Sequence, residues 1–163
     1  MRPSHMELQE KEGVPLIVFL DDNIQMLAGH IEELRRDGFA IAPFETVLNL
    51  LSYLVRRKKN GQSTREVVLV LDMIMEPPSG DPDFSLVRTH HWSLTGLVVL
   101  EKLAGIGCLD GISTIVIHSI AGPQLRDQIL VKAKTLFPDR KVEFVSKHDQ
   151  QALRKEIHAS LAR

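Results

Sequence analysis

The sequence predicts an α/β fold in which one parallel sheet is covered by helices on both faces. Five short apolar runs alternate with five stretches whose apolar residues recur at three- and four-residue steps, the spacing of a helix. A helix between successive strands makes the strands parallel and covers both faces of the sheet. With 163 residues the chain is long enough for one such domain and too short for two ordinary ones.

The first half of the chain is expected to supply three strands and two helices. Asn23 is placed to cap the first helix, and Gly38 ends it. Pro43 indicates that the second strand lies at the edge of the sheet, because proline cannot donate a hydrogen bond to a neighbouring strand. The expected elements are strands at 16–20, 39–44 and 67–71, with helices at 23–38 and 46–57.

The second half continues the alternation after an interruption. Residues 76–95 contain three prolines and a glycine and show neither a helical nor a strand period, so they are expected to form a long loop. A helix resumes at Gly96, and Pro123 suits the first turn of the next helix. The expected elements are strands at 114–119 and 142–146, helices at 96–103 and 123–137, and a final amphipathic helix carrying Leu153, Ile157 and Leu161.

Composition excludes several classes of protein. The net charge of −1 gives no global field that would recruit nucleic acid or an anionic membrane. A single cysteine, Cys108, excludes an internal disulfide and fits a cytoplasmic location as a small buried side chain. No apolar stretch approaches the length of a membrane span. Residues 1–6 have the character of an expression-vector remnant and take no part in the expected domain.

Polar groups that suit phosphate chemistry follow four of the five apolar runs. Because the carboxyl ends of parallel strands meet at one edge of a sheet, these side chains are expected to lie together where such sheets bind ligands. Three carboxylates suit a divalent cation with oxygen ligands, and an ammonium and a hydroxyl suit a phosphoryl group. The residues are Asp21 and Asp22 after the first run, Asp72 after the third, Ser119 after the fourth and Lys147 after the fifth.

At these positions the chain resembles the receiver domain of two-component response regulators, over residues 14–163. The resemblance implies a flavodoxin-like fold with strand order 2-1-3-4-5. It rests on an acidic pair with a helix-closing glycine, an acceptor aspartate, a hydroxyl, an aromatic residue and a lysine in the family's order. These are Asp21, Asp22 and Asn23, Gly38, Asp72, Ser119, Phe144 and Lys147.

The resemblance assigns each of these residues a role. Asp22 and Asp72 would bind Mg²⁺ directly, Asp21 would act mainly through water, and the carbonyl of Ile74 would add a ligand. Asp72 would be the phosphoacceptor, and Lys147 would neutralise the phosphoryl oxygens. Two residues would form the switch: Ser119 would bond a phosphoryl oxygen, and Phe144 would move into the space that Ser119 vacates.

The resemblance also implies partners. A sensor histidine kinase or a histidine phosphotransfer protein would supply the phosphoryl group, and an unidentified downstream protein would receive the signal. Residues 123–163 would form the output face and a possible homodimer contact. The protein is expected to be a stand-alone receiver without direct nucleic-acid or membrane binding. It is expected not to be an enzyme beyond catalysing its own phosphorylation and dephosphorylation.

Four features depart from the family's pattern and keep an alternative open. His148 stands where a proline usually follows the lysine, so the sequence does not decide whether the Lys147–His148 bond is cis or trans. Glu76 replaces another proline, and Ile120 replaces a small residue that borders the acceptor position. The loop at 76–95 is longer than in the family. The alternative is a degenerate receiver that acts as a constitutive interaction module. A haloacid-dehalogenase-like phosphatase is disfavoured, because that family needs an aspartate where this chain has Ile74.

Overall fold

Five parallel strands form one sheet, as the sequence predicts, and their order β2-β1-β3-β4-β5 is the one that the resemblance to receiver domains implies. The structure is a computed structural model, and it describes residues 13–61 and 66–161. The expected vector remnant at 1–6 lies outside these residues. The strands are β1 (Leu16–Leu20), β2 (Ala40–Phe44), β3 (Val67–Leu71), β4 (Ile112–Ser119) and β5 (Lys141–Ser146). Pro43 lies in β2, which is an edge strand as expected.

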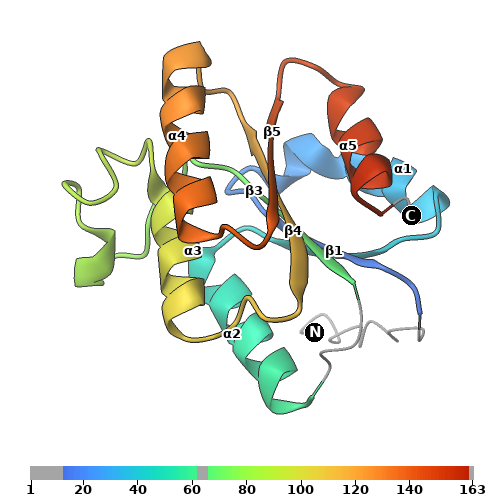
Figure 1. Ribbon diagram of the computed structural model, residues 1–163, viewed down its shortest axis with the longest axis horizontal. Coiled ribbons are helices and arrows are strands. Elements are labelled where there is room, and N and C mark those ends of the chain that lie inside the picture. Colours follow the sequence, from blue (N-terminus) through green and yellow to red (C-terminus); the bar gives the residue numbers. More distant parts are fainter. Residues whose placement is uncertain (1–12, 62–65, 162–163) are drawn as a thin grey trace, which may run out of the picture.

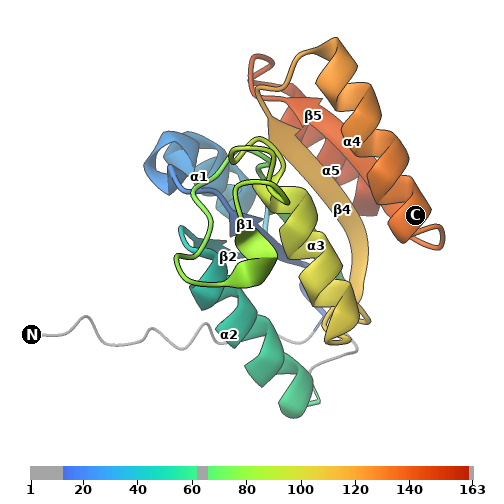
Figure 2. The same ribbon diagram turned by 90° about the vertical axis from the view of Figure 1, so that its left-hand side faces the viewer.

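Helices cover both faces of the sheet, so the molecule has three layers (Figures 1 and 2). One face carries α1 (Ala28–Arg36) and α5 (Ala152–Leu161), and the opposite face carries α2 (Val47–Lys59), α3 (Thr95–Gly105) and α4 (Pro123–Leu136). In the part of the chain that the structure describes, no helix is long and apolar enough to cross a membrane.

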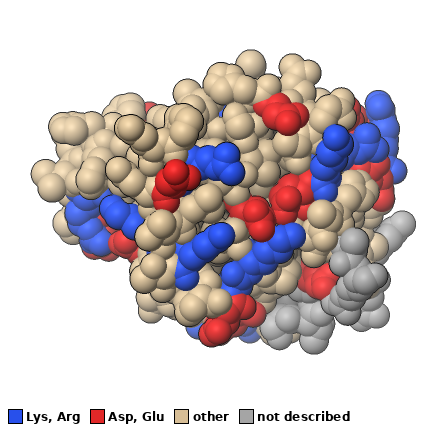
Figure 3. Space-filling model, turned by 45° about the horizontal axis from the view of Figure 1, so that its top comes forward, with Lys and Arg blue, Asp and Glu red and all other residues tan. Residues whose placement is uncertain are grey.

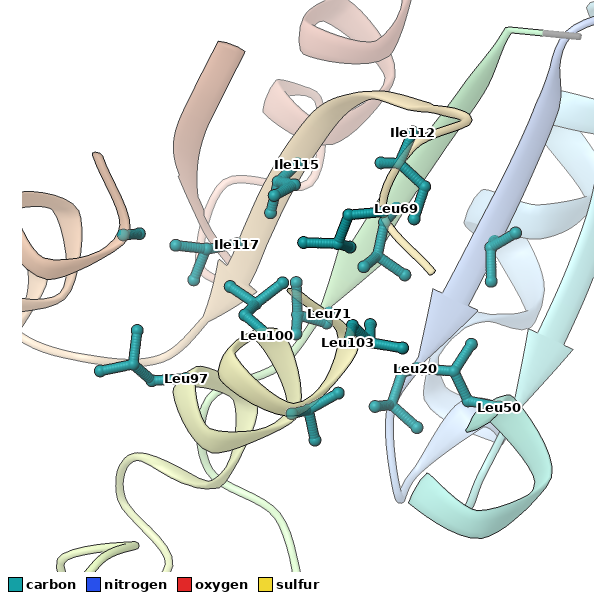
Figure 4. Packing of buried hydrophobic residues seen from close by; sticks show 14 of the residues in the cluster. Leu20, Leu50, Leu69, Leu71, Leu97, Leu100, Leu103, Ile112, Ile115 and Ile117 are labelled. Carbon is teal, nitrogen blue, oxygen red and sulfur yellow. The ribbon is translucent and has the colours of Figure 1, made fainter. Parts of the chain in front are cut away.

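The core explains why the central strands are apolar throughout. Every residue of β1 and β3 is buried, because both faces of these strands are covered by helices. Ile17 and Phe19 of β1 pack toward α1 and α5, whereas the alternate residues of the strand pack toward α2 and α3. Figure 4 shows the larger cluster, in which the leucines of α3 lie against Leu71 of β3 and Ile117 of β4.

The start of the first helix differs from the sequence prediction. Asn23 was expected to cap it, but its side chain makes no capping hydrogen bond. Instead its backbone N–H donates to Asp21 Oδ1 at 2.9 Å, and the chain enters α1 through a short 3-10 helix, η1 (Ile24–Leu27). The side chain that organises this turn is therefore the preceding aspartate. Gly38 follows the helix with φ +96°, a conformation that favours glycine.

The segment between β3 and α3 is a closed loop with a narrow base. Thr95 Oγ1 donates to the carbonyl of Met75 at 2.7 Å, and Gly96 N donates to the carbonyl of Met73 at 3.1 Å. Within the segment a short 3-10 helix, η2 (Pro82–Phe84), buries Phe84. The loop projects beside the first turns of α3 (Figures 1 and 2).

Candidate functional site

The carboxyl ends of the strands bring the predicted residues together. Leu20 and Leu71 are register partners in β1 and β3, so the aspartates that follow these strands emerge side by side. Asp21, Asp22 and Asp72 each offer an oxygen, and these three oxygens lie within 4.8 Å of one another. Lys147 follows β5, and its backbone N–H donates to the carbonyl of Ser119 at 3.0 Å. One edge of the sheet therefore carries the acidic cluster, the hydroxyl and the lysine.

Lys147 forms the electrostatic centre of this edge. Its Nζ lies 2.6 Å from Asp21 Oδ2 and 2.7 Å from Asp72 Oδ2. Burial disfavours the ammonium, but the bonds to Asp21 and Asp72 outweigh that effect and raise the pKa of Lys147. The lysine therefore stays charged and holds two carboxylates that would otherwise repel each other.

The acceptor candidate Asp72 is held at both oxygens. Its Oδ2 contacts Lys147, and its Oδ1 accepts the backbone N–H of Ile74 at 3.1 Å. The side chain is 6% exposed, so little of it reaches solvent. The carbonyl of Ile74 was expected to bind the metal. The contact that the structure provides is made by the amide of this residue, and the carbonyl role stays a prediction.

The two neighbouring aspartates differ in exposure. Asp21 is 2% exposed and serves Lys147 and the backbone of Asn23, whereas Asp22 is exposed. Asp22 Oδ2 accepts the backbone N–H of Glu76 at 3.4 Å, the outer limit of a hydrogen bond. Asp22 is therefore the more accessible carboxylate of the pair, and its expected role as a direct metal ligand stays a prediction.

Two buried polar side chains at the end of β4 stand in contrast to these bonded groups. Ser119 is fully buried, and its Oγ has no hydrogen-bond partner among the described residues. Neither ring nitrogen of His118 has one within that part of the chain either. His118 points away from Ser119, as expected from strand alternation, and packs edge-on against His30 of α1 with ring centroids 5.9 Å apart. Burial, and then the charge of Lys147, lower the pKa of His118 to about 4.

The expected aromatic switch residue, Phe144, is half-buried on β5. The Arg126 guanidinium of α4 lies 5.6 Å from the centre of its ring. This distance permits a cation–π contact, so α4 contacts Phe144 through a charged side chain. The Lys147–His148 bond, which the sequence left open, is trans.

A cavity of about 580 Å³ lies beside the acidic cluster. Its wall includes His30 of α1, His118, Ile120 and Lys147. Ile120, expected to narrow access to Asp72, is 54% exposed at this wall.

Sequence reasoning missed three residues that shape the site. Arg126 and His30 come from helix surfaces that carry no motif, so no local signal points to them. Gly96 was predicted only as the start of a helix, and its role beside Asp72 was missed. A Cβ on Gly96 would lie 2.2 Å from the carbonyl oxygen of Asp72, so only glycine permits α3 to approach the acceptor this closely.

Solved structures share this fold at low sequence identity. A signal receiver domain of a putative LuxO repressor protein from Vibrio parahaemolyticus superposes with a TM-score of 0.61 at 13% identity, covering 91% of this chain and 90% of that one. A response regulator receiver protein from Pseudomonas putida gives 0.61 at 18% identity, with coverage of 91% and 99%. This chain has the receiver-domain fold. Neither a protein-family model nor a curated protein matches the sequence.

A further structure with this fold was solved with a bound metal ion. The response regulator TrrA from Thermotoga maritima, solved in complex with Mg²⁺ and a beryllium fluoride, superposes with a TM-score of 0.53 at 16% identity, with coverage of 91% and 100%. In the present chain, two buried carboxylates and one exposed carboxylate provide hard oxygen donors around one point. That donor set fits Mg²⁺, which keeps several waters and needs few protein ligands.

Proposed function

We propose that this protein is a cytoplasmic phosphoacceptor of a two-component or phosphorelay system, with Asp72 as the acceptor. One observation carries the proposal: Lys147 bridges Asp21 and Asp72 at 2.6 and 2.7 Å beside a third carboxylate. A structural ion pair needs one acid for one base, whereas this cluster has an excess of negative charge on the side where Asp22 is exposed. An excess of carboxylates over cations favours a site that takes up a metal ion.

Asp22 and Asp72 would hold Mg²⁺ directly, with Asp21 and the carbonyl of Ile74 completing the protein's share of the shell. When bound, the ion would neutralise phosphoryl oxygens during transfer. The residues of the chain perform the remaining tasks. The amide of Ile74 and the ammonium of Lys147 fix the Asp72 carboxylate in one orientation, so that the acceptor needs no reorganisation.

Transfer uses Asp72 as a nucleophile. One of its oxygens forms the new bond to phosphorus while the phosphorus–nitrogen bond of a donor phosphohistidine breaks and the imidazole leaves with the bonding pair. Lys147 then exchanges its contact with Asp72 for a phosphoryl oxygen. Because Lys147 also contacts Asp21, it keeps one carboxylate partner throughout this exchange. The donor would be a sensor histidine kinase or a histidine phosphotransfer protein.

The unbonded hydroxyl of Ser119 provides the start of a switch. Drawing this hydroxyl toward a phosphoryl oxygen breaks no hydrogen bond of the described structure. Phe144 would then move toward the space that Ser119 leaves and withdraw from Arg126, which carries the change to α4. NMR spectra with a beryllium fluoride mimic should show shifts across residues 123–150. Shifts confined to the acidic cluster would rule out the switch.

Phosphorylation can be tested by intact mass. Exposure to acetyl phosphate with Mg²⁺ should add the mass of one phosphoryl group, and EDTA should prevent the addition. Asp72→Asn should abolish the gain, while Asp139→Asn, a change in the exposed turn between α4 and β5, should leave it intact. Labelling that survives Asp72→Asn would refute the assignment. No labelling of the wild type would favour the constitutive interaction module, for which the exposed Ile120 at the cavity wall is the supporting observation.

Metal binding has a separate readout. Calorimetry should detect Mg²⁺ binding to the unphosphorylated wild type. Asp22→Asn should abolish that binding while leaving the fold intact, because Asp22 is exposed and does not pair with Lys147. Asp110→Asn, at the other end of the sheet before β4, serves as the matched control. Unchanged Mg²⁺ binding in Asp22→Asn would remove Asp22 from the metal site.

A further inference from the structure

The cavity of about 580 Å³ beside the acidic cluster has two histidines in its wall. His118 belongs to the end of β4, and His30 belongs to α1. His118 is 2% exposed, and neither of its ring nitrogens has a hydrogen-bond partner in the described part of the chain. Buried polar side chains are normally bonded, so this ring is placed to bind a group that enters the cavity.

The separation of the two rings fits imidazoles that share one metal ion. Their centroids are 5.9 Å apart, and their planes lie at 87° to each other. Zn–N bonds of about 2.0–2.1 Å place the centroids of two imidazoles on one ion roughly 5–6 Å apart. Because His30 is half-buried at the wall of the cavity, its ring has room to turn toward an ion that His118 binds.

A carboxylate on the same wall can supply a third ligand. Glu33 follows His30 by three residues on α1, a spacing that puts both on one side of the helix, and it lines the same cavity. Arg154 does not engage this carboxylate, because its guanidinium bonds both oxygens of Asp37. Among the described residues, only the acidic cluster has three such ligands already gathered. The exposed Glu33 side chain therefore has to rotate inward to complete the set.

We propose that this cavity binds a divalent transition-metal ion, with Zn²⁺ as the preferred ion, through His30, His118 and Glu33. Two imidazoles and one carboxylate are a common ligand set for Zn²⁺, and water takes the fourth position of the tetrahedron. Mg²⁺ prefers oxygen ligands, so the two ions would divide between this cavity and the acidic cluster. The bound Zn²⁺ joins α1 to the end of β4, and its binding does not depend on phosphorylation of Asp72.

The charges around the cavity permit a cation. Lys147 lines the cavity, but its ammonium is bonded to both Asp21 and Asp72, so two carboxylates oppose one positive charge. The lowered pKa of His118, about 4, keeps its imidazole at neutral pH in the uncharged form that binds metal ions. On the face that Figure 3 shows, basic and acidic side chains are intermingled, and no continuous positive surface repels a cation.

Calorimetric titration of Zn²⁺ into the full chain, with Mg²⁺ in excess, tests the proposal. We expect one Zn²⁺ site, which His30→Gln, His118→Phe and Glu33→Gln should each weaken by about tenfold or more. His91→Gln, which changes an exposed histidine of the loop between β3 and α3, should leave the affinity unchanged. His30 lies at the surface of α1, so His30→Gln decides the outcome even if His118→Phe fails to fold.

Two further measurements locate the ion. Nitrogen NMR spectra of the histidine rings should show His30 and His118 shifting together as Zn²⁺ is added, with His91 unchanged. Asp22→Asn, which should lose Mg²⁺, should keep its Zn²⁺ site. The absence of binding at about 0.1 mM Zn²⁺ would overturn the proposal. So would full affinity in His30→Gln, loss of Zn²⁺ binding in Asp22→Asn, or ring shifts that leave His118 unaffected.

Discussion

The polar groups at the ends of β3 and β4 are treated in opposite ways. Asp72, after β3, is bonded at both oxygens, to Lys147 and to the amide of Ile74. Ser119 and His118, at the end of β4, are just as buried but have no hydrogen-bond partner in the described part of the chain. A bonded group is fixed in place, whereas an unbonded neutral group can be moved at little energetic cost. The β3 end therefore has the properties of an anchor and the β4 end those of a moving part.

The largest change in stability is expected when Lys147, which anchors the β3 end, is replaced. Lys147→Met leaves Asp21 and Asp72 buried without their cation, and we expect it to destabilise the fold by about 3–4 kcal/mol in metal-free buffer. Mg²⁺ should restore part of this loss by supplying another cation. Urea unfolding with EDTA or with Mg²⁺ measures both effects, with the exposed Lys155→Met as control. Equal stability of the two variants would show that the anchor contributes no more than a surface pair.

His118 at the β4 end should give stability a distinct pH dependence. The pKa of His118 is lowered from 6.5 to about 4, chiefly because the ring is buried. Between these values the unfolded chain holds a proton on His118 that the folded chain lacks, so stability falls as the pH drops through this window. The fall should amount to roughly 2–3 kcal/mol. His118→Phe should flatten this part of the curve in denaturant titrations, and the exposed His148→Gln should not. An unchanged slope in His118→Phe would place the proton uptake elsewhere.

The smallest effect compares two buried hydroxyls. Thr95 Oγ1 donates to the carbonyl of Met75 at 2.7 Å, whereas Ser119 Oγ has no partner in the described structure. Thr95→Val should therefore cost about 1–2 kcal/mol, and Ser119→Ala should stay within about 0.5 kcal/mol of the wild type. Thermal melts of both variants measure the difference. If Ser119→Ala costs as much as Thr95→Val, the β4 end is bonded in solution and is no moving part.

Sequence patterns predicted most of the fold because its strands and helices each have a characteristic spacing of apolar residues. Fully apolar runs predicted the buried strands, and Pro43 predicted the edge strand. The ends of the predicted strands indicated that Asp21, Asp72 and Lys147 lie together. These features are local, and each needs only the spacing of residues along one element. The start of the first helix was wrong in detail. The N–H of Met26, which a capping Asn23 side chain could have accepted, donates to the backbone carbonyl of Asn23 instead, and spacing along the sequence does not decide between these two acceptors.

Contacts between distant elements were beyond such patterns. Arg126 over Phe144 joins α4 to β5, and His30 against His118 joins α1 to β4. The loop at 76–95 was expected, but nothing in its residues predicted the ion pairs to Lys102. These arrangements depend on how helices pack, and a single sequence carries no record of that packing.

The narrow base of this loop has a consequence for how the chain can change over time. Because Thr95 and Gly96 tie its second end to the carbonyls of Met75 and Met73, both ends remain in place whatever lies between them. Closure entropy grows only with the logarithm of loop length, so doubling the segment would cost only about 0.6 kcal/mol. Exposed residues between these ties are thus open to insertion, deletion and replacement, while Asp72, a few residues away, keeps its geometry. The same fold can acquire a new recognition surface without any change in the geometry of the acidic cluster and Lys147.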